Sequence, residues 1–441
     1  MEAFNLSWTK YAPLEDETSV LDPLAFDYFA QILGNVVLPS FTTRTSRARY
    51  YSMVCYGIYI SRKYLQSEGK PYYEKDILAI FKLYEKYWAR AVVENYEGNL
   101  FERDGKERDF RGKRGALKSY EKNITTLGLE YKFLSRQLEL GGLGSYRTSL
   151  EALQLVDGSL NLTHKGEKLA KAFVDTVIYD KLVLKAIKDK SIVMKEGRGS
   201  VKSFGYHTRL DGFMYSDTYH KEEIDLLKDY ILNDAKAIIP VSYIFDNYDY
   251  DNPNSIKTIE DISNSNGKTD GEIYIVQGYK TILAFEKLAI EFNRLWCSII
   301  KAAEEQFGSI TIGECVQASK EILDNIFENN YIGDLVTKQN YSSILESYHG
   351  GSFNIFISNY TKNKNVRYES FIMDLIKYHI KVMEKRRSRA WVAIDGNNII
   401  VLTGYDYPRK TENLAYLHSY KIPNIITLIN DLRWKPNDKV H

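Results

Sequence analysis

Residues 276–306 carry the longest uninterrupted helical pattern in this chain of 441 residues. Apolar side chains recur there at intervals of three or four residues, which places them on one broad face of a helix. The members of this face are Ile282, Phe285, Leu288, Ala289, Phe292, Leu295, Trp296 and Ile299. Helical spacing recurs at 22–38, 46–59, 74–95 and 367–386. The pattern therefore predicts a mainly α, multi-domain helical protein.

Two segments depart from plain helical spacing. Residues 127–178 read as helices, a short hairpin around Asp157–Gly158 and a further helix, which predicts an embedded winged-helix module. In the stretch "AWVAIDGNNIIVLTG", the residues on both sides of Gly396–Asn397 alternate in the manner of β-strands, and this pattern predicts a C-terminal β-hairpin. The predicted domains are an N-terminal helical domain at 1–122, a winged-helix-like module at 123–180, a helical connector at 181–250, and a C-terminal helical domain at 251–441 with its hairpin at 390–404.

The charge balance limits how such a chain can bind nucleic acid. Its 59 basic and 58 acidic residues give a net charge of +1, so any polyanion must bind to local patches. The three cysteines are an odd number, which argues against a disulfide framework. No basic region precedes an apolar run at the N-terminus, and no stretch reaches the roughly 18 apolar residues that span a bilayer. We expect a cytoplasmic protein without a membrane partner.

The stretch "FTTRTSRARYYS" at 41–52 is the first candidate binding site. Helix starts expose unpaired amides and attract anions. Thr43 and Thr45 can cap such a start, and Arg44, Arg47 and Arg49 can bind phosphate oxygens. The alternative is that these arginines pair with carboxylates elsewhere in the fold.

Further candidates lie in the winged-helix segment and in two basic runs. Arginine and tyrosine at the start of a recognition helix suit phosphate and base contacts. The candidates in the module are Tyr146, Arg147, Thr148, Lys165 and Lys168, and those in the runs are Arg111, Lys113, Arg114, Arg386, Arg387 and Arg389. A module that only packs against other helices, and basic runs that are only solvated, are the alternatives.

Catalytic and metal motifs are incomplete. Asp249, Asp251 and Glu260 have calcium-loop spacing, but Pro253 and Asn254 stand where a ligand and the turn glycine belong. The acids and lysine of "TDGEIYIVQGYK" have the wrong spacing for a metal-dependent nuclease. Glycine-rich phosphate loops and dinucleotide fingerprints are also missing. We therefore assign no catalytic residue, no metal and no cofactor.

The stretches "DPLAFDYFAQILGNVVLP" and "FTTRTSRARYYSMVCYGIYI", followed by the winged-helix segment and the terminal hairpin, carry a resemblance. The chain resembles uncharacterised bacterial proteins from gene clusters for defence against phage and plasmids. We therefore expect a nucleic-acid-binding or adaptor/sensor subunit of a bacterial antiviral defence complex that is not itself catalytic. The expected partners are nucleic acid, with DNA favoured, and other protein subunits of the same gene cluster. The alternatives are a divergent metal-dependent nuclease or other effector enzyme, and a structural scaffold for an ATPase or nuclease partner.

Overall fold

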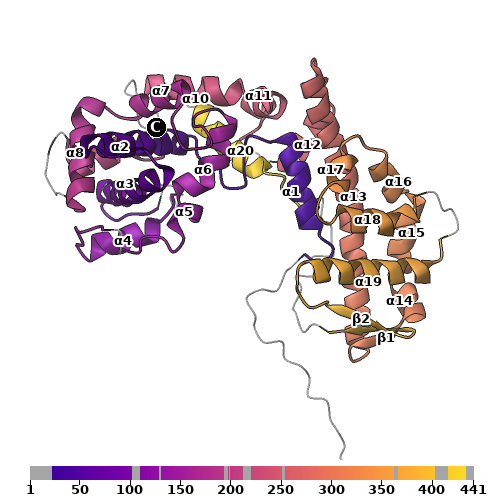
Figure 1. Ribbon diagram of the computed structural model, residues 1–441. Helices are drawn as coiled ribbons and strands as arrows, with labels where there is room; N and C mark the ends of the chain where they lie inside the picture. Colours follow the sequence, from indigo (N-terminus) through magenta and orange to yellow (C-terminus); the bar gives the residue numbers. More distant parts are fainter. Residues whose placement is uncertain are drawn as a thin grey trace, which may run out of the picture. The chain divides into compact units, whose positions relative to one another are not determined.

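The computed structural model describes residues 22–101, 110–128, 131–192, 197, 199–211, 220–250, 254–361, 366–402 and 416–433. The fold is mainly helical, as predicted, with one small antiparallel sheet (Figure 1). The chain forms two compact units. Unit 1 contains Met1–Val37 and Asn252–Tyr420, and unit 2 contains Leu38–Asp251 and Lys421–His441. No helix in the described ranges is long and apolar enough to cross a membrane.

Unit 2 is helical throughout its named elements. They are α2 (Arg49–Ser67), α3 (Glu74–Asn95), α4 (Lys113–Glu121), α5 (Gln137–Leu140), α6 (Gly142–Ala152), α7 (His164–Phe173), α8 (Thr176–Asp189), α9 (Val201–Thr208), α10 (Lys221–Leu232), α11 (Ile238–Asn247) and α20 (Ile422–Arg433). Helix α2 is the central element, because it packs against α3, α6, α7 and α8. Every residue from Arg49 to Ile58 is buried, so the first half of this helix is enclosed on all sides.

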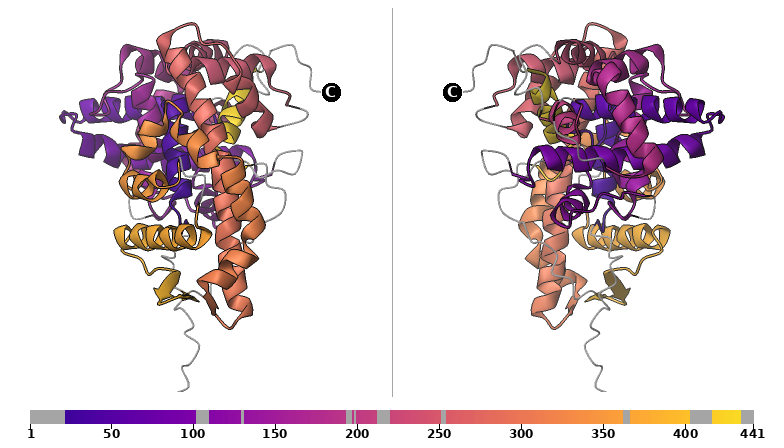
Figure 2. Two further views of the ribbon diagram at one scale, coloured as in Figure 1. Left: turned by 90° about the vertical axis from the view of Figure 1, so that its right-hand side faces the viewer. Right: turned by 90° about the vertical axis from the view of Figure 1, so that its left-hand side faces the viewer.

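Unit 1 is built around one long helix. Its elements are α1 (Phe26–Val37), α12 (Ser255–Ser263), α13 (Asp270–Glu305), β1 (Ser309–Thr311), α14 (Ile312–Ala318), α15 (Lys320–Glu328), α16 (Tyr331–Val336), α17 (Tyr341–Leu345), α18 (Gly350–Ser358), α19 (Tyr368–Lys385), β2 (Val392–Asp395) and β3 (Asn398–Val401). Helix α13 runs the length of this unit and contacts α1, α12, α14, α15 and α16 (Figure 2). Its predicted apolar face, from Ile282 to Ile299, is buried against these neighbours.

The predicted hairpin forms, with Asp395 opposite Asn398 and a positive φ of 57° at Gly396. It gains a third strand that the sequence did not predict, because Ser309 of β1 pairs with Ile400 of β3. The strand order is β1-β3-β2.

Local capping explains several helix starts. Asp22 accepts a hydrogen bond from the Phe26 amide at 2.6 Å, which fixes the first turn of α1. Thr163 and Thr269 cap α7 and α13 in the same way. Two stretches form helices although their sequences are typical of loops. Residues 101–122 are highly charged and glycine-containing, yet 113–121 form α4, and 102–109 lie outside the described residues. The stretch 244–272 is rich in Asp, Asn, Ser and Gly, yet 255–263 form α12.

Candidate nucleic-acid interface

The arginine-rich start of α2 does hold an anion, but the anion belongs to the chain itself. The carboxylate of Asp431, on α20, accepts hydrogen bonds from Arg47 Nε at 2.9 Å and from the Ala48 amide at 3.0 Å. Burial raises the pKa of Asp431 above its usual range, although the charge of Arg47 opposes this shift. The phosphate predicted at this helix start is thus replaced by an internal carboxylate.

Arg49 is enclosed more completely. Its side chain has no exposed surface and pairs with Glu223 of α10 at 2.9 Å, whose side chain is equally buried. The guanidinium also donates to the backbone oxygens of His207 and Arg209. Burial alone would raise the pKa of Glu223, but the charge of Arg49 and the hydrogen bonds of the cluster outweigh it and lower the pKa.

Phosphate binding is therefore wrong for Arg47 and Arg49, which instead follow the alternative that they pair with carboxylates elsewhere in the fold. The physical reason is that each has a carboxylate partner inside unit 2, so its charge is satisfied without a ligand. Thr45 is also buried, and its hydroxyl donates to the Thr42 oxygen at 3.0 Å. Thr43 and Arg44 are exposed.

The start of α6, expected as a recognition helix, also holds an internal carboxylate. Glu85 of α3 is 1% exposed and accepts hydrogen bonds from the Gly142 amide at 2.5 Å and from Gln137 at 2.8 Å. Burial raises the pKa of Glu85 to about 7, against these hydrogen bonds and the charge of Arg111. The first amide of α6, which could bind a phosphate, is thus bonded to Glu85.

The expected reading face of α6 packs against α2. Tyr146 is buried, and its hydroxyl accepts from the Arg47 amide at 2.9 Å and donates to the Arg47 oxygen at 3.0 Å. The Ser149 hydroxyl lies 2.6 Å from that of Tyr51. Tyr146 is consequently wrong as a base-reading residue of an exposed helix, while Thr148 is exposed. The expected wing is reduced to one bridge, between Val156 and Leu162, so a winged helix stays a prediction.

Two further candidate arginines are neutralised by acids. Arg147 pairs with Glu74 at 2.6 Å and with Glu151 at 3.0 Å. In unit 1, Arg386 pairs at 2.8 Å with Asp22, the residue that caps α1. These ion pairs join separate helices and their caps, so both arginines have a structural role.

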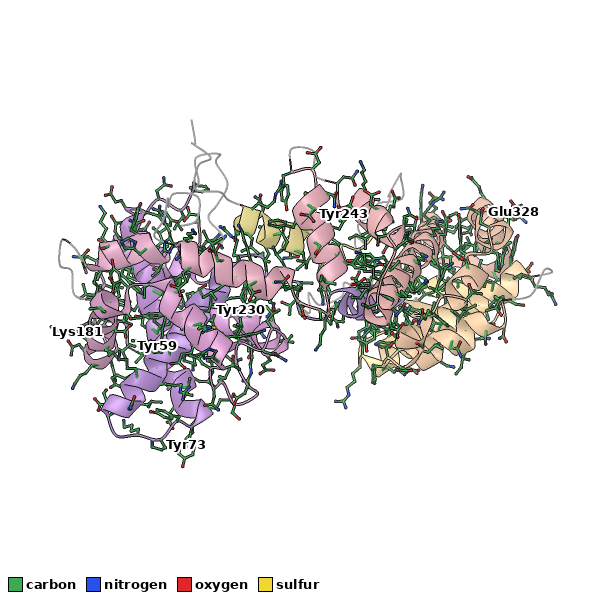
Figure 3. All side chains as sticks on the ribbon, turned by 90° about the horizontal axis from the view of Figure 1, so that it is seen from above. Tyr59, Tyr73, Lys181, Tyr230, Tyr243 and Glu328 are labelled. Carbon is green, nitrogen blue, oxygen red and sulfur yellow. The ribbon has the colours of Figure 1, made fainter. Side chains whose placement is uncertain are left out.

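The remaining candidates lie at or near the surface. Arg111 and Lys113 are half-buried. Six of the predicted candidate cations are exposed. Arg44, Arg114, Lys165 and Lys168 belong to unit 2, and Arg387 and Arg389 belong to unit 1. Lys165 lies over the ring of Tyr230, with its ammonium 5.3 Å from the ring centroid, and Figure 3 labels this tyrosine.

Sequence reasoning missed one charged cluster entirely. In unit 1, His418 lies between two carboxylates: its Nε2 is 3.2 Å from Asp27 Oδ1 and its Nδ1 is 2.5 Å from Glu286 Oε1. The Tyr420 hydroxyl also donates to Glu286 Oε1. Burial by itself lowers the pKa of His418, but the hydrogen bonds to Asp27 and Glu286 outweigh it and raise the pKa to about 9. This cluster attaches the 416–420 segment to α1 and α13. No local signal could have revealed it, because its members are far apart in sequence.

Comparison with known proteins adds no relative: the chain matches no family model, no curated protein and no solved structure. Within the described ranges, no three His, Cys, Asp or Glu side chains are arranged to hold a metal ion. The chain leaves unit 2 after Asp251, one residue beyond the predicted boundary at 250/251, and the predicted boundaries at 122/123 and 180/181 fall inside that unit.

Proposed function

We propose that this chain is a recognition or adaptor subunit of a bacterial antiviral defence complex, in which another chain supplies catalysis. It binds nucleic acid through the phosphate backbone, with DNA favoured. The proposal rests on the resemblance of residues 22–60 to defence-associated proteins and on the exposed cations that remain in unit 2.

One observation carries the nucleic-acid part of this proposal. Arg44, Arg114, Lys165 and Lys168 are exposed, and among the described residues no carboxylate lies within 4.0 Å of their charged groups. Arg47, Arg49 and Arg147, in contrast, are all paired with acids. Cations without an acidic partner can release counterions from a polyanion, which is the main source of sequence-independent affinity.

The test is a salt titration of binding to a labelled DNA duplex. A variant with Arg44, Arg114, Lys165 and Lys168 changed to Gln should bind more weakly, and the plot of log affinity against log salt should flatten by up to about 0.9 for each phosphate that the variant no longer neutralises. The matched control changes Arg294, Lys301, Lys320 and Lys338 of unit 1 to Gln, since each of these pairs with an acid. An equal weakening in both variants, or no binding by the unaltered protein, would contradict the proposal.

A structural adaptor that binds only proteins is the second candidate. It is favoured by the internal ion pairs of Arg47 and Arg49 and by the burial of Tyr146, since these residues were expected to contact nucleic acid. Co-purification with the products of neighbouring genes, in the absence of any oligonucleotide shift, would support this candidate over the first.

A further inference from the structure

Helix α19 in unit 1 carries a row of lysines. Lys377, Lys381 and Lys385 follow one another at intervals of four residues, and a helix rises about 1.5 Å per residue, so their Cα atoms stand roughly 6 Å apart along the axis. Lys377 and Lys381 are exposed, and Lys385 is half-buried. Arg387 lies two residues after Lys385, past the helix end, where its φ is 54°, and it is exposed.

The charge of this row is largely uncompensated. Lys377 pairs with Asp374 at 3.3 Å. Among the described residues, no carboxylate lies within 4.0 Å of the charged groups of Lys381, Lys385 or Arg387. Glu384 is exposed between them and is the one acid of the run 384–389. The helix C-terminus favours cations, but its partial negative charge is only about half a unit.

An aromatic ring lies beside the row. Tyr348, between α17 and α18, is 60% exposed. Its hydroxyl donates to the backbone carbonyl oxygen of Lys385 at 3.2 Å. In return, Lys385 Nζ donates to the backbone carbonyl oxygen of Tyr348 at 2.8 Å. The same ammonium lies 5.1 Å from the centre of the Tyr348 ring. The ring is therefore held in place at the end of α19, in a residue that is largely open to solvent (Figure 1 labels α17, α18 and α19).

The neighbouring histidine has an unsatisfied polar atom. His349 is 3% exposed, and its Nδ1 has no hydrogen-bond partner among the described residues. Burial, with the charges of Arg386 and Lys385, lowers the pKa of His349 to about 4. Its ring lies edge-on to Tyr348, with the centroids 4.9 Å apart. A neutral ring thus supports Tyr348 from the protein side.

We propose that Tyr348, Lys381, Lys385 and Arg387 form a binding surface for single-stranded nucleic acid. A base stacks on the exposed Tyr348 ring, and the flanking phosphates lie along the lysine row and Arg387. A single strand is the partner because its bases are free to stack on protein rings, whereas the bases of a duplex are stacked on one another. This inference rests on the proposed function and specifies its ligand and a second surface.

The experiment measures fluorescence anisotropy of the full chain with labelled oligothymidylate, oligouridylate and a duplex, each of about 20 units, to exceed a typical single-strand site. Tyr348→Leu removes the ring and Tyr348→Trp keeps an aromatic face. A third variant changes Lys381, Lys385 and Arg387 to Gln. The matched control changes Lys181, Lys185 and Lys188 of α8 to Gln, which removes the same charge from the surface of unit 2 (Lys181 is labelled in Figure 3).

We expect Tyr348→Leu to weaken single-strand binding about tenfold, because stacking on one aromatic ring contributes roughly that much, while Tyr348→Trp retains it. The Lys381/Lys385/Arg387 variant should also flatten the salt dependence by about 2, from roughly 0.7 for each of three phosphates. Duplex binding should be unaffected by Tyr348→Leu. The two single strands, DNA and RNA, show which sugar the surface prefers. Circular dichroism checks that each variant is folded.

Two results would overturn this inference while leaving the proposed function intact. In one, Tyr348→Leu binds single strands as tightly as the unaltered chain. In the other, the α8 control loses as much single-strand affinity as the Lys381/Lys385/Arg387 variant. Binding of the duplex alone would do the same. If the unaltered chain binds none of the three oligonucleotides, both the proposed function and this inference fail.

Discussion

At the scale of single residues, the partner decides what a charged side chain does. Arg44 and Arg49 lie in the same stretch of sequence, yet one is exposed and the other has no exposed surface. A buried guanidinium needs a carboxylate and several acceptors, and Arg49 has Glu223 and two backbone oxygens. Such a pair fixes helix positions and is sensitive to loss of either partner.

Arg49→Met should lower the free energy of unfolding by roughly 3–5 kcal/mol, because it leaves the Glu223 carboxylate buried without its cation. The double variant Arg49→Met/Glu223→Leu should lose clearly less than the sum of the two single changes, since it removes both charges. Urea unfolding of the four proteins measures the coupling. Additive losses would show that the two charges do not depend on each other.

His418 should make unit 1 sensitive to alkaline pH. The pKa of His418 is raised to about 9 in the folded protein, above the roughly 6.5 of an unfolded histidine. Its stabilisation is therefore complete below about pH 6.5 and is lost as the pH rises through about 9, by up to about 3 kcal/mol. Unfolding free energies across this range should fall more for the unaltered chain than for His418→Gln, and the difference between the two profiles measures the contribution of His418. NMR titration of the imidazole at an ordinary pKa would contradict the assignment.

At the scale of elements, close helix packing depends on small residues. A Cβ built on Gly205 in α9 would lie 1.9 Å from the Ala91 oxygen of α3, so the two helices touch through backbone atoms. A Cβ on Gly271, near the start of α13, would meet nothing within 4 Å. The two glycines thus have different roles within helices.

Gly205→Ala should destabilise unit 2 by roughly 1–3 kcal/mol, because backbone atoms cannot move aside as a flexible side chain can. Gly271→Ala is the matched control and should be neutral or stabilising by about 0.5 kcal/mol, from helix propensity. Thermal unfolding of the two variants gives the comparison. Similar midpoints for both would mean that α9 can shift away from α3 without cost.

At the scale of the whole molecule, the chain order differs from the spatial order. The chain passes between the units three times, and α20 returns to unit 2 after the end of unit 1. Helix α20 buries Ile425, Leu428 and Leu432 and supplies Asp431 to the start of α2. Lys421, just before α20, donates to the Leu38 and Phe41 oxygens, and burial lowers its pKa to about 8.

A chain that ends at residue 420 should therefore lose stability in unit 2, where the first turn of α2 loses its carboxylate cap and the apolar face of α20 is absent. Hydrogen exchange should accelerate in α2, α10 and α11, while α13 and α19 stay protected. Asp431→Asn, which keeps an oxygen acceptor but removes the charge, should reproduce only a small part of the effect. Unchanged exchange in α2 after truncation would show that α20 does not support it.

Much of the local structure could be predicted from sequence. Periodicity and turn chemistry among residues close in sequence are enough to predict several features. These are the limits of α3, the apolar face of α13, the Asp22 cap and the hairpin around Gly396. The candidate site could not be predicted as well. Its residues were correctly read as anion-binding, but the anions of Arg47 and Arg49 are side chains 384 and 174 positions away.

The sequence by itself determined that this protein is helical, where its helices carry apolar faces, and that its helix starts attract negative charge. These properties depend on neighbours in the chain. Only the tertiary structure decided which charges remain for a ligand, because Asp431, Glu223 and Glu85 reach the predicted sites through folding alone. Tyr348 and the α19 lysines come together for the same reason, since proximity in space and not spacing in sequence places a ring beside them.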